Sequence, residues 1–256
     1  MARDLEFIVF AHARSGSTTL CNALQLNPQL RILIEPFNET FTQWRPGAKN
    51  YRELVKDTES LDLYLDEMFV DHNGVKALDY QMPRSIYAHM VSNPDRRVVF
   101  LKRANILQSV VSVLISEQTG VWHSWDLKDP VEERYRDLEP LSIADIRKRI
   151  GDLKREMGFY DGVISARPPE ATLELTYEDL YLHGVEQRQQ LLEETFAFLG
   201  VAPPPREETE KLMDPGRTKL NSDSTYLRLP NASEIQQAVG NDETGWLLDR
   251  ASADSD

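Results

Sequence analysis

The sequence has little cysteine, no long hydrophobic run and a deficit of positive charge. Its single cysteine, Cys21, cannot form an internal disulfide, so nothing points to an oxidising compartment. The apolar stretch near the start, Phe7–Ala11, has five residues and is too short for a signal sequence. No other stretch approaches the roughly 18 apolar residues that a membrane span needs. We therefore expect a cytoplasmic protein without a membrane span.

The charge balance restricts the ligands further. Twenty-nine Lys and Arg residues face 42 Asp and Glu residues, which gives a formal net charge of −13. Nucleic acids and anionic membranes are bound mainly through Lys and Arg, so neither is an expected partner. A small anionic ligand would need a local basic pocket. The hydrophobic content of 41% is that of an ordinary soluble enzyme.

Short apolar runs alternate with segments of helical periodicity, which is typical of a parallel sheet with crossover helices. Expected strands cover residues 7–11, 31–34, 74–78, 98–101 and 173–176. Expected helices cover 17–26, 61–70, 105–118 and 187–199, with a further helix starting at Ser142. Residues 36–50, 123–140 and 203–233 look irregular. We expect one α/β domain over residues 1–235 and a C-terminal segment over 236–256 with a frayed acidic tail.

The loop after the first expected strand has the composition of an anion-binding loop. Between a buried strand and a helix, backbone N–H groups and the helix N-terminus can cradle an anion. The nucleoside-triphosphate form GxxxxGK[ST] requires a Lys after its last Gly, but Ser17 follows Gly16 here. The alternative is a simple Ser/Thr helix cap beside a Gly turn. The candidate binding residues are Arg14, Ser15, Gly16, Ser17, Thr18 and Thr19.

A second candidate anion site follows the strand at 98–101. Arg103 stands at the end of that strand, and Ser109, Ser112 and Ser116 share one stripe of the next helix. A strand-end Arg and these hydroxyls can together hold a phosphate. The alternative is a solvated helix face beside a surface arginine.

These residues resemble those of sulfotransferases that use 3′-phosphoadenosine 5′-phosphosulfate (PAPS). Residues 14–18 match the family's basic-Ser-Gly-Thr/Ser-Thr loop, which holds the 5′-phosphosulfate. Arg103 and Ser112 are nine residues apart, as in a bacterial branch that sulfates sugars and includes trehalose-type enzymes. The resemblance implies a P-loop-type three-layer α/β fold with a mainly parallel central sheet and helices on both faces. It also implies that Arg103 and Ser112 bind the 3′-phosphate, with Ser109 in reserve.

Two weaker matches extend the resemblance over most of residues 5–235. The segment 176–180 is similar to one whose Tyr contacts adenine in relatives, which makes Tyr177 a candidate cofactor contact. A strand-end Tyr beside a helix-capping Asp is the alternative. The loop containing Lys219, with Arg217, Thr218, Asn221 and Ser222, falls where the family closes a basic loop over the 3′-phosphate.

Sulfuryl transfer needs a base for the acceptor hydroxyl and positive charge where the leaving phosphate gains charge. The animal branch uses a His after its third strand, but the matching residues here are Lys76-Ala77-Leu78. The bacterial branch uses a Glu after the second strand, which implies that Glu35 is the base. Glu39 is a reserve, and His12 and His123 are competitors because a histidine beside either loop can titrate near neutrality. Arg14 would stabilise the bridging oxygen.

The acceptor is the least defined part. Four aromatic residues in or beside the irregular loops are candidates to line its pocket: Trp44, Trp122, Trp125 and Tyr135. The bacterial resemblance favours a hydroxyl of a sugar or glycolipid. No metal motif is present, so no metal is expected, and Cys21 is expected to pack in the core. The expected activity is that of an EC 2.8.2-type sulfotransferase; the rivals are a kinase-like phosphotransferase and a non-catalytic nucleotide-binding module. Nothing indicates the oligomeric state.

Overall fold

The structure is a computed structural model that describes residues 5–39, 49–122, 135, 137–214 and 223–248. Its chain divides into two compact units. The first unit comprises the described residues of Met1–Lys102 and Met157–Asp214, and the second those of Arg103–Glu156 and Pro215–Asp256.

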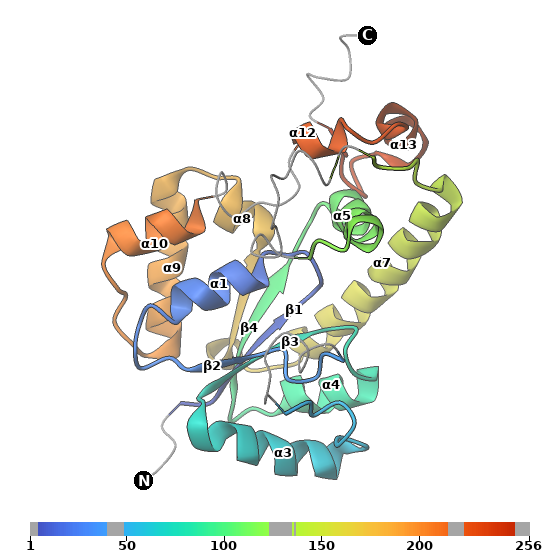
Figure 1. Ribbon diagram of the computed structural model, residues 1–256. Helices are drawn as coiled ribbons and strands as arrows, with labels where there is room; N and C mark the ends of the chain where they lie inside the picture. Colours follow the sequence, from blue (N-terminus) through green and yellow to red (C-terminus); the bar gives the residue numbers. More distant parts are fainter. Residues whose placement is uncertain (1–4, 40–48, 123–134, 136, 215–222, 249–256) are drawn as a thin grey trace. The chain divides into compact units, whose positions relative to one another are not determined.

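A parallel sheet of five strands forms the centre of the first unit (Figure 1). The strand order is β2-β3-β1-β4-β5, and every neighbouring pair is parallel. The strands are β1 (Phe7–Ala11), β2 (Ile32–Ile34), β3 (Gly74–Leu78), β4 (Arg97–Lys102) and β5 (Thr172–Thr176). In register, Ala11 lies opposite Leu78 on one side and Leu101 on the other, so these strands end at the same edge of the sheet.

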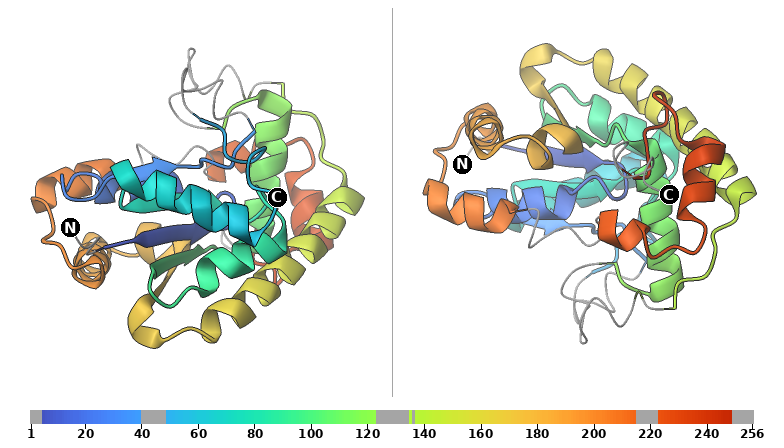
Figure 2. Two further views of the ribbon diagram at one scale, coloured as in Figure 1. Left: turned by 90° about the horizontal axis from the view of Figure 1, so that it is seen from below. Right: turned by 90° about the horizontal axis from the view of Figure 1, so that it is seen from above.

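The alternating side chains of β1 enter two separate hydrophobic cores, one on each face of the sheet. Phe7, Val9 and Ala11 pack on one face, while Ile8 and Phe10 pack on the other. The first face is covered by α1 (Ser17–Leu24), α8 (Tyr177–Tyr181), α9 (Val185–Leu199) and α10 (Arg206–Met213). The opposite face is covered by α3 (Thr58–Asp71), α4 (Arg84–Ser92) and the end of α7 (Ile143–Ser165). In both views of Figure 2, α10 (orange) lies beside α1 (blue). The fold is therefore a three-layer α/β arrangement, as expected.

The second unit is helical. It contains α5 (Ile106–Thr119), the first part of α7, α12 (Asp223–Tyr226) and α13 (Ala232–Val239). The α5 helix ends at Gly120, which has a left-handed φ of 70°. The expected start of α7 is also confirmed, because the Ser142 hydroxyl accepts a hydrogen bond from the Asp145 N–H at 3.3 Å.

The expected strands all form, and two of them, Phe7–Ala11 and Gly74–Leu78, have the expected bounds. The expectation that residues 203–233 are irregular is wrong, because α10, α12 and the start of α13 lie there. The α10 helix was missed because only Thr209 and Met213 of its eight residues are buried, which is too few to produce a visible apolar period. The α4 and α8 helices also escaped the sequence analysis; they have nine and five residues. A short 3₁₀ turn, η2 (Pro169–Ala171), precedes β5.

Candidate active site

The loop between β1 and α1 has an unusual backbone. Arg14 has a φ of 61° and Gly16 a φ of 82°, and both values lie in the left-handed region. The α1 helix begins directly afterwards at Ser17, with no side chain capping its N-terminus and no acidic residue in its first turn. The first N–H groups of a helix have no partner within the helix, and its N-terminus carries partial positive charge. This loop therefore offers backbone donors and the Arg14 side chain to an anion.

Two contacts hold this loop in place. The Ser15 hydroxyl, which is fully buried, donates to the backbone oxygen of His12 at 2.7 Å, so this side chain closes the loop. The Tyr181 hydroxyl donates to the backbone oxygen of Gly16 at 2.8 Å. A Cβ atom on Gly16 would lie 2.5 Å from Cε2 of the Tyr181 ring, so only glycine fits. Burial raises the pKa of the Tyr181 hydroxyl, which keeps it protonated as a donor.

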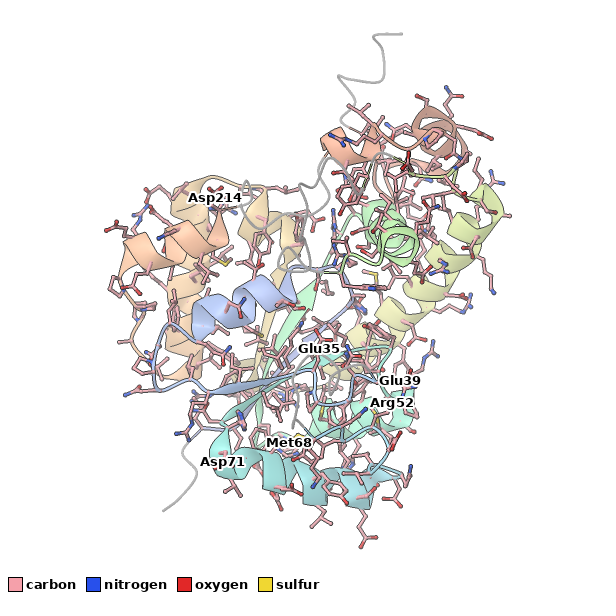
Figure 3. The ribbon with its side chains drawn as sticks, viewed as in Figure 1. Glu35, Glu39, Arg52, Met68, Asp71 and Asp214 are labelled. Atoms are coloured by element: carbon pink, nitrogen blue, oxygen red, sulfur yellow. The ribbon has the colours of Figure 1, made fainter. Side chains whose placement is uncertain are left out.

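Glu35 follows β2 and lies at the centre of a buried polar network (Figure 3). Its side chain is 8% exposed and its φ is 51°. Its Oε1 accepts from Lys76 Nζ at 2.5 Å, and its Oε2 accepts from Gln81 Nε2 at 2.8 Å and from Asn38 Nδ2 at 2.9 Å. Lys76 Nζ also donates to Thr18 Oγ1 at 2.7 Å. Lys76 thus connects the candidate base with the first turn of α1.

His12 forms a second acid–base pair in the same unit. Its Nδ1 lies 2.7 Å from Asp79 Oδ2, and both side chains are buried. Its Nε2 is buried and has no hydrogen-bond partner among the described residues. The ring packs edge-on against Phe100, with 5.6 Å between the ring centroids. An imidazole that is fixed at one nitrogen by a carboxylate can accept a proton at the other, so His12 stays a competitor to Glu35.

The other two candidates for the base differ from these. Glu39 is exposed and pairs with Arg52 at 3.1 Å, whereas Glu35 is buried (Figure 3 labels all three residues). His123 lies outside the described residues. Among the described candidates, therefore, only Glu35 and His12 are buried beside the β1–α1 loop.

In the second unit, the stripe of serines on α5 is buried. Ser109, Ser112 and Ser116 are 3%, 1% and 1% exposed, and Arg103 is 5% exposed. The alternative of a solvated helix face beside a surface arginine is therefore wrong. Arg103 Nη2 donates to Gln108 Oε1 at 2.6 Å.

The start of α5 is closed by other parts of the second unit. The Asn105 side chain caps it by accepting from the Gln108 N–H at 2.9 Å. The Leu107 N–H donates to the backbone oxygen of Thr244 at 2.8 Å. Two of the first backbone N–H groups of α5 are therefore already hydrogen-bonded, whereas α1 has no side-chain cap.

Tyr177 is the first residue of α8 and is buried in the core, with its ring 4.9 Å from that of Tyr181. The cap of α8 comes from Thr176, whose hydroxyl accepts from the Asp179 N–H at 3.1 Å, and not from an aspartate. Lys219 and its neighbours Arg217, Thr218, Asn221 and Ser222 lie outside the described residues.

Half of the aromatic acceptor candidates can be placed. Trp122 is half-buried and Tyr135 is buried, both in the second unit. Trp44 and Trp125 lie outside the described residues.

Three residues of the site were missed from the sequence: Lys76, Tyr181 and Gln108. Lys76 had a visible signal, because it is a charged residue in the middle of the otherwise apolar run of β3. A lysine is almost never fully buried unless it is paired. Tyr181 and Gln108 had no such signal, since their contacts join residues 165 and 139 positions apart in the chain.

The described part of the chain has neither a membrane-spanning helix nor a cluster of metal ligands. None of the helices there is long and apolar enough to cross a membrane. No group of three or more His, Cys, Asp or Glu side chains there is arranged to hold a metal ion.

Neither a protein-family model nor a curated protein sequence matches the chain. Among solved structures, it is similar to the sulfotransferase domain from the curacin biosynthetic pathway. The TM-score is 0.45 and the sequence identity 18%, over 79% of this chain and 76% of the other.

Proposed function

We propose that the protein is a PAPS-dependent sulfotransferase of EC 2.8.2 type, which moves a sulfuryl group to a hydroxyl of a small acceptor, a sugar or a glycolipid. One observation carries this proposal: the first turn of α1, which follows the candidate anion-binding loop, is joined through Lys76 to a buried carboxylate, Glu35. A group-transfer enzyme needs a site that binds the group donor and, next to it, a base that deprotonates the acceptor.

The residues of the loop fit a phosphosulfate. The α1 N-terminus lacks a side-chain cap, and the positively charged Arg14 precedes Ser17 by three residues. The candidate loop donors are the backbone groups of residues 15–19 and the Thr18 and Thr19 hydroxyls. When bound, PAPS supplies an activated sulfuryl group attached to a good leaving phosphate.

Glu35 accepts the acceptor's hydroxyl proton as the hydroxyl oxygen bonds to sulfur. The bond from sulfur to the bridging oxygen breaks, and its electron pair stays on that oxygen. Arg14 stabilises this negative charge, a role worth about 2.7–4 kcal/mol of barrier in comparable sites. Lys76, Gln81 and Asn38 hold the Glu35 carboxylate in place by donating to its two oxygens.

The 3′-phosphate is assigned to residues of the second unit. Arg103 supplies the charge and Ser112 a hydroxyl, with Ser109 as the reserve. Tyr177 is assigned to the adenine and Lys219 to the closing loop, both on the family resemblance. With a net charge of −13, the protein depends on a few focused groups of this kind to hold so anionic a ligand.

The test is transfer of labelled sulfuryl from PAPS to a panel of sugars, glycolipids and phenols. Glu35→Gln should lower kcat by roughly 10²–10⁴. The matched control is Glu39→Gln, because Glu39 is an exposed carboxylate four positions further on; this variant should keep wild-type turnover. All variants are compared at a temperature where melting curves show them folded.

Three results would contradict the proposal. Loss of turnover in His12→Gln but not in Glu35→Gln would move the base to His12. Transfer of labelled phosphate from ATP with magnesium would show a phosphotransferase. Nucleotide binding without transfer to any acceptor of the panel would show a binding module.

A further inference from the structure

Residues 241–248, the C-terminal turn, form a compact hydrogen-bonded unit after α13. The Asn241 side chain accepts from the N–H groups of Glu243 and Thr244, both at 2.9 Å. Asn241 and Gly245 also form an antiparallel bridge, with N–O distances of 3.2 and 2.9 Å. The Thr244 hydroxyl donates back to the oxygen of Val239 at 2.7 Å. The turn therefore has a defined shape of its own.

The C-terminal turn is fixed to the start of α5. Its Thr244 oxygen accepts from the Leu107 N–H at 2.8 Å. Its Trp246 oxygen accepts from Asn105 Nδ2 at 2.8 Å, and its Leu247 oxygen from Gln108 Nε2 at 3.1 Å. These three hydrogen bonds, all within four residues, fix the position of the turn along α5.

Two further features hold the turn in this position. Gln236 of α13 accepts from the Leu247 and Leu248 N–H groups at 2.8 and 3.1 Å. Gly245 has a φ of 85°, and a Cβ atom on it would lie 2.4 Å from Asn105 Oδ1. Only glycine allows the turn to approach α5 so closely.

The Gln108 side chain links the turn to Arg103. Its Nε2 donates to the turn, while its Oε1 accepts from Arg103 Nη2 at 2.6 Å. An amide has its donor and acceptor on opposite sides, so Gln108 cannot flip without losing both bonds. Gln108 is also neutral, and it orients the guanidinium without cancelling its charge.

We propose that Gln108 and the C-terminal turn position Arg103 for the 3′-phosphate, and so determine the preference for 3′-phosphorylated adenine nucleotides. This inference rests on the proposed function. Arg binds phosphate through a planar fork, so its affinity depends on orientation as well as charge. Gln108 is a positioning residue, because it acts through Arg103.

The test compares two ligands that differ only in the 3′-phosphate, 3′,5′-adenosine bisphosphate and AMP, by calorimetry at constant ionic strength. In Gln108→Leu, the Kd for AMP divided by the Kd for the bisphosphate should fall about tenfold. This is the effect expected from losing an oriented hydrogen bond to a charged group. The Kd for AMP should stay within about twofold, since Gln108 has no role at the 5′ end.

Two other variants sharpen the test. Gly245→Ala should lower the same ratio, because it displaces the turn without altering Gln108 or Arg103. Gln118→Leu is the matched control: Gln118 lies on the same helix and bonds the backbone of Glu139. Its ratio should equal that of the wild type.

Each outcome separates the inference from the proposed function. If the wild type prefers the bisphosphate and Gln108→Leu keeps that preference, the positioning role is wrong and the function stands. If Gln108→Leu weakens both ligands equally, Gln108 is only structural. If the wild type shows no preference for the bisphosphate, the proposed function and this inference both fall.

Discussion

The two strand–helix junctions that carry arginines, β1–α1 and β4–α5, are built in opposite ways. Arg14 follows β1 and Arg103 follows β4, and each precedes a helix. The start of α1 has no side-chain cap. The start of α5 is capped by Asn105 and also covered by the Thr244 oxygen.

This difference separates two kinds of anion recognition. An uncapped helix N-terminus binds anions through its backbone N–H groups, and these donors can bind many different phosphate-like groups. A capped start leaves recognition to side chains, whose direction depends on their neighbours, as that of Arg103 depends on Gln108. Under the proposed function, the first junction holds the reacting group and the second selects the nucleotide.

The largest predicted effect concerns Lys76, which contacts both Thr18 at the start of α1 and Glu35. Lys76→Met should lower the free energy of unfolding by about 3–5 kcal/mol, because it leaves the Glu35 carboxylate buried without its charged partner. Urea denaturation measures this loss. The double variant with Glu35→Gln should recover part of it. Lys154→Met, which breaks the pair with the exposed Glu243, should cost under about 1 kcal/mol. Equal losses in the two lysine variants would contradict the account.

Gly16→Ala should have the next largest effect. Alanine is strained at a φ of 82°, and its Cβ would meet the Tyr181 ring, so we expect a loss of about 2–4 kcal/mol. Gly120→Ala is the control, because Gly120 has a φ of 70° but no atom within 4 Å of a built Cβ. The difference between the two variants, measured by denaturation, isolates the contact with Tyr181. No difference would mean that Tyr181 does not support the loop.

At the capped junction, Asn105→Ala should cost about 1–2 kcal/mol through loss of the helix cap and of the bond to the Trp246 oxygen. The comparable change on α1, Asn22→Ala in the middle of that helix, should cost nearly nothing. Thermal or urea unfolding gives both values. A cost for Asn105→Ala no greater than for Asn22→Ala would show that the cap is not what distinguishes the two junctions.

The smallest predicted effect concerns Cys21, which lies on the buried face of α1 and should not react with thiol reagents in the folded protein. Burial raises the pKa of its thiol to about 12. An unburied thiol has a pKa of 9.0, so burial of the neutral thiol contributes stability that is present below about pH 9. This stability falls as the pH rises from there towards 12. At pH 8 a thiol reagent should therefore label the protein only after denaturation. Rapid labelling of the folded protein would mean that α1 opens readily.

The layers of the fold were predictable because buried parallel strands have continuous apolar runs, as in β1 and β4. Short helices such as α10 were not, since two buried residues cannot establish a period. The β1–α1 loop was predictable from its residue types, and so was a carboxylate after β2.

The partners of these groups could not be predicted. The contacts of Glu35 with Lys76 and of Gln108 with Leu247 join residues far apart in the sequence, and only the fold brings them together. A buried Ser stripe on α5 and a solvated one have the same spacing, so the sequence could not distinguish them. Lys76 was the exception, because a lysine within an apolar strand indicates a buried charged partner.

The most direct test of the central claim is thermal melting of the protein with 3′,5′-adenosine bisphosphate and, separately, with ATP and magnesium. At about a hundred times its Kd, the bisphosphate should stabilise the protein by about 2.7 kcal/mol and raise the Tm by roughly 5–10 °C. ATP with magnesium should raise it much less, because it lacks the 3′-phosphate assigned to Arg103. No rise with millimolar bisphosphate, or a larger rise with ATP and magnesium, would contradict the account.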